Sequence, residues 1–275
     1  MSSRPLPFLL ICLTTLCVCV PLFAQDRGYH LELSDGTSGW AILVNDSQKN
    51  IEAYHFSAKC WSAGQLKGGT EYSYDALESS GTSRSGPWNN VAGIISHRDV
   101  LEPGARMVSV EKLLPQPSGC VWDADFDAVI YADGSYAGDA MRVRCLQARR
   151  DGIAEMVKYW SNRLAQEAVS RSSLETIRTD AERLKEEDWK KTMARCNKLP
   201  LSCEYWRGRY QIDGDVAMQT RPRSDGPEIH GYRGIIQMYA RQEKKIEADV
   251  ALKNLHAVFP ISEALAEEEN QSRAQ

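Results

Sequence analysis

The chain has 275 residues, a formal net charge of −4 at pH 7 and 43% hydrophobic residues, which suffices for one large domain or two smaller ones. The charge is uneven: residues 25–140 contain 8 basic and 16 acidic residues, whereas residues 141–275 contain 24 basic and 21 acidic ones. This division predicts two parts with different surfaces, and the acidic balance argues against a nucleic-acid partner.

The N-terminal segment has the pattern of a cleaved secretory signal. One charge, Arg4, precedes an apolar run from Leu6 to Phe23, and the small residue Ala24 suits a cleavage site before Gln25. The run is short for a membrane-spanning helix, and no later stretch is apolar enough to cross a bilayer. We therefore expect residues 1–24 to be a signal peptide and the mature chain to be secreted or periplasmic, with no membrane span.

Residues 25–138 are rich in strand patterns. The stretch from Gly39 to Trp61 reads as two alternating strands joined by an Asn/Asp/Ser-rich turn, which predicts a β-hairpin. Further strands are expected near residues 30–33, 70–74, 91–96, 106–110 and 120–131. About seven strands with turn signals at regular spacing favour an antiparallel β-sandwich domain.

From Asp139 the hydrophobic period changes from two to about 3.6 residues, which predicts helices. We expect about three long α-helices in residues 139–260. Asp139 would cap the first, and Ser172 with Glu175 would form a capping box at the start of the second. The third would begin near Pro227 and end at Pro260.

The helical region also contains breaker signals. Gly152 lies inside the first helical pattern and is expected to bend or split that helix. Residues 201–225 are expected to be irregular, and residues 261–275 to form a frayed helix that ends in a flexible tail. The fold class is thus α+β, with an N-terminal sandwich and a C-terminal helical region.

Five cysteines remain after the signal, and disulfides are expected in an exported chain. Cys196 and Cys203 flank a short loop that a bridge could close. Cys60 and Cys120 lie at the ends of predicted strands, which would leave Cys145 unpaired, although the sequence leaves the connectivity open. No Cys-x-x-Cys pair exists and the histidines are scattered, so neither a metal nor another cofactor is expected.

Three carboxylates alternate along one predicted strand. Asp123, Asp125 and Asp127 would project from one face, where they could bind Ca²⁺ or another cationic ligand. The alternative is a solvated acidic face, because the opposite face carries Trp122, Ala124, Phe126 and Ala128, an ordinary core stripe.

Tryptophan is frequent in the β-rich half. Trp40 and Trp122 are expected in the core, whereas Trp88 follows Gly-Pro in a loop and is the one expected to be exposed. Trp88 together with the three aspartates is therefore a candidate ligand site of the carbohydrate-binding kind.

No catalytic residue is predicted, because no nucleophile elbow, zinc-protease signature or phosphate-binding loop is present. His55 falls within a strand and is expected to be a hydrogen-bonded sheet residue. Five arginines cluster between the second and third predicted helices, where they could meet an anionic partner or the acidic half of the chain: Arg207, Arg209, Arg221, Arg223 and Arg233.

The segment Val44–Ala53, VNDSQKNIEA, followed later by Leu101-Glu-Pro-Gly104, resembles a pattern in small immunoglobulin-like sandwiches of exported bacterial proteins that are uncharacterised. The resemblance covers roughly residues 28–138. It implies an immunoglobulin-like fold and an exported setting, and it carries over no catalytic residue.

These patterns favour a non-catalytic envelope or extracellular interaction protein, with a protein partner or self-association through the helices. A carbohydrate- or ligand-binding sandwich is the first alternative. The second is a hydrolase whose site assembles from residues distant in sequence.

Overall fold

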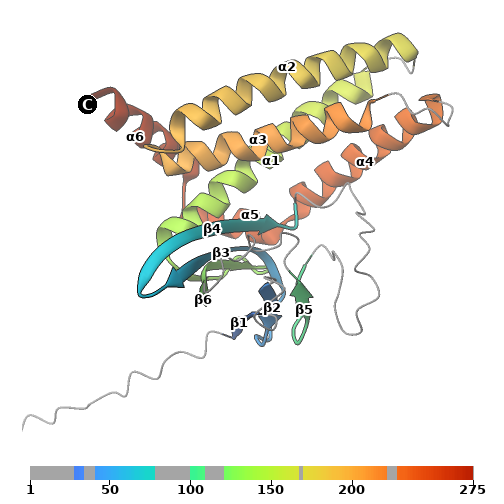
Figure 1. The fold of residues 1–275 in the computed structure, drawn as a ribbon. Coiled ribbons are helices and arrows are strands. Elements are labelled where there is room, and N and C mark those ends of the chain that lie inside the picture. Colours follow the sequence, from blue (N-terminus) through green and yellow to red (C-terminus); the bar gives the residue numbers. More distant parts are fainter. Residues whose placement is uncertain are drawn as a thin grey trace, which may run out of the picture.

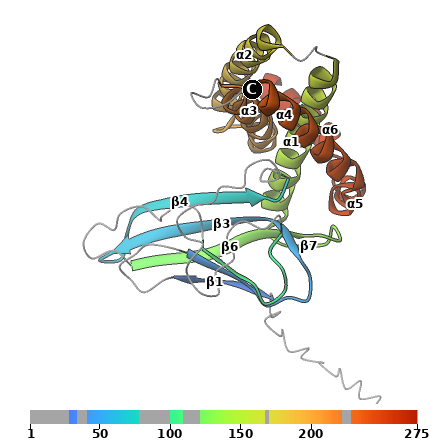
Figure 2. The same cartoon turned by 90° about the vertical axis from the view of Figure 1, so that its right-hand side faces the viewer.

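The structure is a computed structural model that describes residues 28–33, 41–77, 100–108, 121–166, 170–221 and 228–274. It has a mixed α+β architecture in which antiparallel sheets precede a helical region, as expected (Figure 1). The helices lie together on one side of the sheets (Figure 2).

The described strands form two antiparallel sheets. One has the order β1-β2-β5 and consists of β1 (Tyr29–Leu33), β2 (Ala41–Asn45) and β5 (Arg106–Val108). The other has the order β4-β3-β6-β7 and consists of β3 (Ile51–Ser62), β4 (Gln65–Asp75), β6 (Val121–Tyr131) and β7 (Tyr136–Gly138). The two sheets share one hydrophobic core, in which Tyr29 of β1 packs edge-on against Phe126 of β6.

The expected hairpin between Gly39 and Trp61 is wrong. β2 pairs with β1 and β5, whereas both edges of β3 are occupied by β4 and β6. The polar turn does form, because the Ser47 amide donates to Asn45 Oδ1 at 3.0 Å. β2 and β3 belong to different sheets, so this turn carries the chain from one sheet to the other and does not close a hairpin.

A tight hairpin joins β3 to β4. Ala63 and Gly64 have φ values of 51° and 74° and separate the paired residues Ser62 and Gln65. Positive φ at both central positions is typical of the two-residue turns that match the twist of paired strands.

A register shift in β6 changes which face its residues occupy. His55 of β3 pairs with Ala128, but the next residue, Phe56, pairs with Phe126, so Asp127 is the extra residue of a β-bulge. Phe126 therefore faces the core between the sheets, whereas Ala128 packs with the helices. The expected core residues are Trp122, Ala124 and Phe126 on the face between the sheets, and Ala128 is also buried in a core, but on the opposite face, against the helices.

The helical region contains six helices in the described residues, where about three were expected. They are α1 (Ala140–Gln166), α2 (Arg171–Arg195), α3 (Pro200–Gln219), α4 (Glu228–Ala248), α5 (Val250–Val258) and α6 (Ile261–Ala274). No helix among the described residues is long and apolar enough to cross a membrane.

The local signals for helix starts are partly correct. Asp139 caps α1, since its Oδ1 accepts from the Arg142 amide at 2.9 Å. The cap of α2 is Ser170, which accepts from the Ser173 amide, and not the expected Ser172. Pro260 separates α5 from α6.

Two segments are more regular than expected. α3 occupies most of residues 201–225 because Pro200 suits a first helical turn and Ile212 and Val216 are buried in the helical core. The helix expected after Pro260 is present as α6, but it extends to Ala274 where a flexible tail was expected, and its Ile261 and Ala264 pack in a core with Leu201 of α3.

Gly152 does not interrupt α1. A Cβ at Gly152 would overlap the backbone oxygen of Tyr205 in α3, and a Cβ at Gly208 would overlap the backbone oxygen of Arg149 in α1. The two glycines therefore allow α1 and α3 to cross with their backbones in close approach.

The helices are fixed to the β4-β3-β6-β7 sheet by apolar contacts and by one buried cation. Ala53 of β3 and Ile130 of β6 pack with Val143 and Leu146 of α1 and with Leu255 of α5. Arg150 of α1 is fully buried and forms ion pairs with Glu52 of β3 (2.8 Å), Asp75 of β4 (3.2 Å) and Asp249 before α5 (3.1 Å).

The cysteines follow the spacing argument where they are described. Cys196 and Cys203 form a disulfide across the α2–α3 turn, and Cys145 is free and buried. Cys60 is disulfide-bonded, and Cys120, the partner expected for it, lies outside the described residues.

Candidate binding cleft

A cleft of about 470 Å³ lies where the outer face of the β4-β3-β6-β7 sheet meets the helices. The sheet contributes His55, Glu71, Tyr72 and Ser73. The helix α1 contributes Arg142, Cys145, Leu146 and Arg149. The α2–α3 turn and α3 contribute Cys196, Pro200, Cys203, Glu204, Arg207 and Gln211.

Strand alternation sets the sheet side of the cleft. Ala53 faces the helices, so His55 and Ser57, two and four residues further along β3, lie on the same face. Ser73 is the cross-strand partner of His55, and Glu71 is that of Ser57. The outer face of the sheet is thus apolar where α1 and α5 cover it and polar where the cleft opens.

His55 is buried and held by Asp127. Its Nδ1 lies 2.8 Å from Asp127 Oδ2, and the Ser57 hydroxyl donates to the other carboxylate oxygen at 3.2 Å. Burial lowers the pKa of His55, as does the charge of Arg142, against the opposing effect of Asp127. With Nδ1–H donating to the carboxylate, Nε2 is left as an acceptor, which can accept a hydrogen bond or a proton from a bound molecule.

Arg142 connects the helix side to the sheet. Its Nη2 and Nη1 donate to the two carboxylate oxygens of Glu71 at 2.7 and 3.4 Å. Glu71 is 57% exposed and its Oε2 lies 3.8 Å from His55 Nε2. This ion pair therefore stands at the mouth of the cleft, and solvent reaches it.

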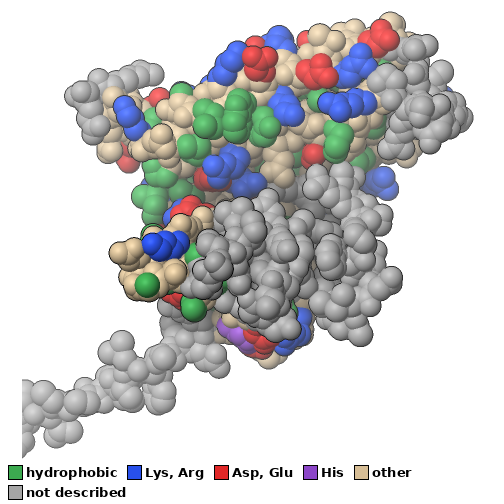
Figure 3. Space-filling view, viewed as in Figure 1, with side chains coloured by type: hydrophobic (Ala, Val, Ile, Leu, Met, Phe, Trp, Pro, Cys, Tyr) green, Lys and Arg blue, Asp and Glu red, His purple; other side chains and the backbone are tan. Residues whose placement is uncertain are grey.

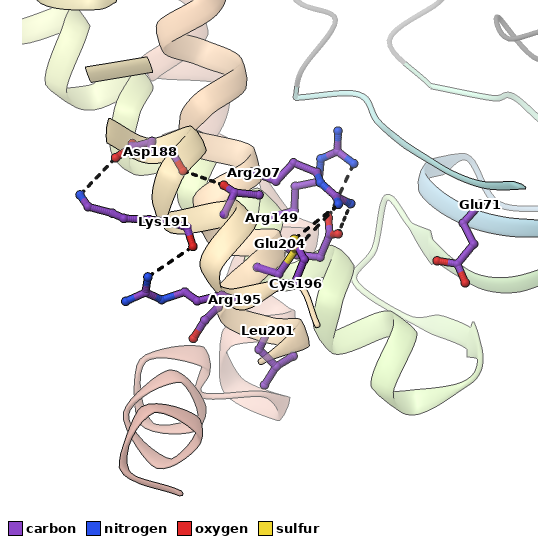
Figure 4. The surroundings of a disulfide bond; sticks show 12 residues. Glu71, Arg149, Asp188, Lys191, Arg195, Cys196, Leu201, Glu204 and Arg207 are labelled. Atoms are coloured by element: carbon purple, nitrogen blue, oxygen red, sulfur yellow. Dashed lines mark hydrogen bonds and ion pairs between the residues drawn. A yellow bond between two sulfur atoms is a disulfide. The ribbon is translucent and has the colours of Figure 1, made fainter. Parts of the chain in front are cut away.

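The second charged group surrounds the disulfide (Figure 4). Glu204 forms ion pairs with Arg207 and with Arg149, whose Nη1 lies at 3.8 Å. Arg149 also donates to Gln211 Oε1 at 2.9 Å, and Arg207 Nη2 lies 3.8 Å from both disulfide sulfurs. Figure 4 shows these side chains together on the helices, with Glu71 on a strand across from them.

The free thiol in the cleft is not a nucleophile at neutral pH. Burial raises the pKa of Cys145 to about 12, and the charge of Glu204 adds to the effect. The thiolate is the reactive form of cysteine, so Cys145 remains protonated and acts as a small apolar residue.

Of the three aspartates expected to bind a ligand, only Asp127 contacts a residue that lines the cleft. Asp127 supports His55, whereas Asp123 and Asp125 are exposed further along the same face of β6 and do not line the cleft. Among the described residues, no group of three or more His, Cys, Asp or Glu side chains has an arrangement that could hold a metal ion. Trp88, Trp40, Ala24 and Gln25 lie outside the described residues.

The sequence interpretation named Arg207 as an arginine that could meet an anionic partner or the acidic half of the chain, but it missed Arg142 and Arg149, which also line the cleft. Arg142 and Arg149 are seven residues apart, which places them on one face of α1, and Glu204 and Arg207 are neighbours on α3. His55 was expected to be a hydrogen-bonded sheet residue, and its contact with Asp127 confirms this. The signal that could have found Arg142 and Arg149 is that α1 carries arginines on an otherwise buried face.

Comparison with known proteins gives no further identification. No family model matches the chain, and no curated protein and no solved structure matches it.

Proposed function

We propose that the chain is an exported, non-catalytic interaction protein that binds its ligand or partner in the cleft. The observation that carries this proposal is the cleft itself, a space of about 470 Å³ lined by charged side chains from both the sheet and the helices. Its size is within the range of small-molecule sites, and convergent polar groups are what gives such sites their specificity.

The way the two parts are joined supports binding at this place. Arg150 and the apolar contacts of α1 and α5 fix the helices on the sheet, so the two walls of the cleft are held at a set separation. A site held open in this way loses little conformational freedom when it binds.

Export to the periplasm or the extracellular medium and an immunoglobulin-like identity for the sandwich belong to the same proposal. Their support is the leader-like N-terminus, the resemblance of residues 28–138, and the disulfide at Cys196–Cys203, a bond that persists in oxidising compartments.

A protein partner would find a second surface on the helices, where hydrophobic side chains lie among charged ones (Figure 3). On α2, Trp189 and Met193 are 46% and 54% exposed. Nearby, Lys191 Nζ lies 4.0 Å from the ring centre of Trp206 on α3. Exposed tryptophan beside cations is typical of the residues that dominate protein interfaces.

Native mass spectrometry of the protein recovered from its host tests the proposed function. We expect the wild-type chain to carry bound material and Ser73→Tyr, which fills the cleft, to lack it. The control is Lys67→Tyr, which introduces the same residue on the same strand outside the cleft and should retain the bound material. Bound glycan would support the carbohydrate-binding alternative, and equal occupancy in all three proteins would exclude the cleft as the site.

Intact mass under denaturing, non-reducing conditions tests export. We expect a chain that begins at Gln25 and has lost four hydrogens to two disulfides. A chain that retains the leader, or that has five free thiols, would contradict the exported setting.

A further inference from the structure

We propose that the cleft binds a small polar molecule through a carboxylate group, which takes the place of the Glu71 carboxylate on Arg142. This inference rests on the proposed function and names the chemistry of its ligand. Its first basis is charge: three arginines line the cleft against two glutamates, whereas the whole chain has a net charge of −4. A positive lining in an acidic protein concentrates small anions.

The Arg142–Glu71 pair is the one that a ligand can replace. Glu71 is 57% exposed and bound to one arginine, while Glu204 is 15% exposed and shared between Arg149 and Arg207. An exposed ion pair contributes little free energy because water screens it and its side chains lose freedom. Exchanging Glu71 for a ligand carboxylate therefore costs little, and Glu71 serves as a displaceable internal counter-ion.

The geometry matches a carboxylate. Arg142 already donates from two nitrogens to two oxygens of one carboxylate, the planar fork arrangement in which arginine is most selective. The group that Arg142 binds in this structure is a carboxylate, so inorganic phosphate serves as the comparison anion in the test.

The remaining lining predicts a polar ligand. His55 Nε2 lies 3.8 Å from the Glu71 oxygen that the ligand would replace. It can therefore accept a hydrogen bond from a hydroxyl group beside the ligand carboxylate. The Ser73 hydroxyl and the Gln211 amide add donors and acceptors, and few lining residues besides the cysteines are apolar: Tyr72, Leu146 and Pro200. A hydroxy acid or dicarboxylic acid fits this lining better than a fatty acid.

Calorimetric titration with succinate, citrate and inorganic phosphate tests the inference in four proteins. We expect the wild-type chain to bind succinate or citrate. The Glu71→Gln variant should bind the same acid roughly fivefold to tenfold more tightly, because Arg142 is released from its ion pair. Arg142→Gln should lose the binding. Arg183→Gln, which removes an arginine from an ion pair on α2 outside the cleft, should leave it unchanged.

A fifth protein, Arg142→Lys, and native mass spectrometry distinguish the carboxylate inference from other kinds of binding in the cleft. Arg142→Lys, which keeps the charge but removes the fork, should bind more weakly than wild type and more tightly than Arg142→Gln. Phosphate binding as tight as that of the carboxylates, or unchanged affinity in Arg142→Gln, would overturn the inference. If native mass spectrometry finds a cleft-dependent ligand that has no carboxylate, the inference fails and the proposed function stands.

Discussion

Asp213 is a buried carboxyl group at the centre of the helical region. It is fully buried on α3, and its Oδ1 accepts from Trp160 Nε1 of α1 at 2.7 Å. Burial raises its pKa to about 7, and the charge of Asp188 on α2 adds to this, whereas the Trp160 hydrogen bond and Arg209 oppose it. Asp188 is bound by Arg209 at 2.9 Å, and the same guanidinium also pairs with Glu155, so its charge is shared and only partly offsets the burial of Asp213.

This environment makes the stability of the protein depend on pH in a defined direction. Between the ordinary pKa of 3.8 and about 7, the folded chain binds more protons at Asp213 than the unfolded chain does. The contribution of Asp213 to the free energy of unfolding is therefore fully present below about pH 4. It is lost as the pH rises through about 7, at a rate of order 1 kcal/mol per pH unit.

Asp213→Asn should remove that part of the pH dependence, because the amide oxygen still accepts from Trp160 and the side chain cannot ionise. Urea denaturation at pH 5 and pH 8 measures the effect. We expect the free energy of unfolding to fall less between these two pH values in the variant than in the wild-type chain. An equal fall in both would show that Asp213 is ionised throughout.

At the scale of elements, the α1–α3 crossing organises the helical region. Gly152 and Gly208 each face the backbone of the opposite helix, where a side chain has no room. The buried residues of α1 beyond this crossing, among them Ile153, Met156 and Trp160, then pack with α3 and α4 in one core.

Gly152→Ala should destabilise the fold, because the added methyl group overlaps the Tyr205 carbonyl and the helices must separate. A cost of about 1–3 kcal/mol is typical of overpacking. Gly214→Ala on α3 is the matched control, since its Cβ would lie 3.5 Å from the Lys185 side chain. There the better helix propensity of alanine should stabilise by up to about 1 kcal/mol.

Chemical denaturation followed by circular dichroism checks both changes. The free energy of unfolding should fall in Gly152→Ala and rise in Gly214→Ala, although both are glycine-to-alanine changes in the same pair of helices. Two stabilising changes would mean that the α1–α3 crossing is looser than the structure shows.

Sequence reasoning succeeded where the signal is local. The Asp139 cap, the apolar stripe of α1 and the break at Pro260 each depend on residues a few positions apart. It failed where the partner is distant, as when Gly152 was interpreted as a helix breaker because α3 was not recognised as a helix. The β2–β3 hairpin failed for the same reason, since strand partners are chosen by the whole sheet.

The candidate site shows the same division. The pattern of alternating aspartates correctly placed Asp127 on one face of its strand, and Arg207 was named as able to meet an anionic partner or the acidic half, but nothing indicated that Arg142 would line the same cleft. Arg142 and Arg207 come from different helices, and they line one cleft with the sheet because Arg150 and the apolar contacts fix α1 on that sheet.

At the scale of the whole molecule, Arg150 joins four elements. It is fully buried between carboxylates of β3, β4 and the α4–α5 junction. Asp75 also accepts from the Leu77 amide, and Asp249 caps α5 through the Leu252 amide. The residues of this charge cluster do not line the cleft. The cleft still depends on them, because they hold α1 on the sheet.

Arg150→Met should destabilise the protein by about 3–5 kcal/mol, because it leaves buried carboxylates without their cation. Arg183→Met is the control, as its ion pair with Glu187 is exposed and on one helix. Thermal and urea unfolding measure both. A small effect of Arg150→Met would mean that apolar contacts alone hold the helices on the sheet.

The most direct test of binding in the cleft is the imidazole NMR signal of His55 in histidine-labelled protein. Burial lowers the pKa of His55, whereas the contact with Asp151 raises that of His256 on α5, so the two signals separate in a pH titration. On addition of a small-molecule extract from the host compartment, we expect the His55 signal to shift and the His256 signal to stay. A His55 signal that does not move, or that moves together with His256, would contradict a binding site in the cleft.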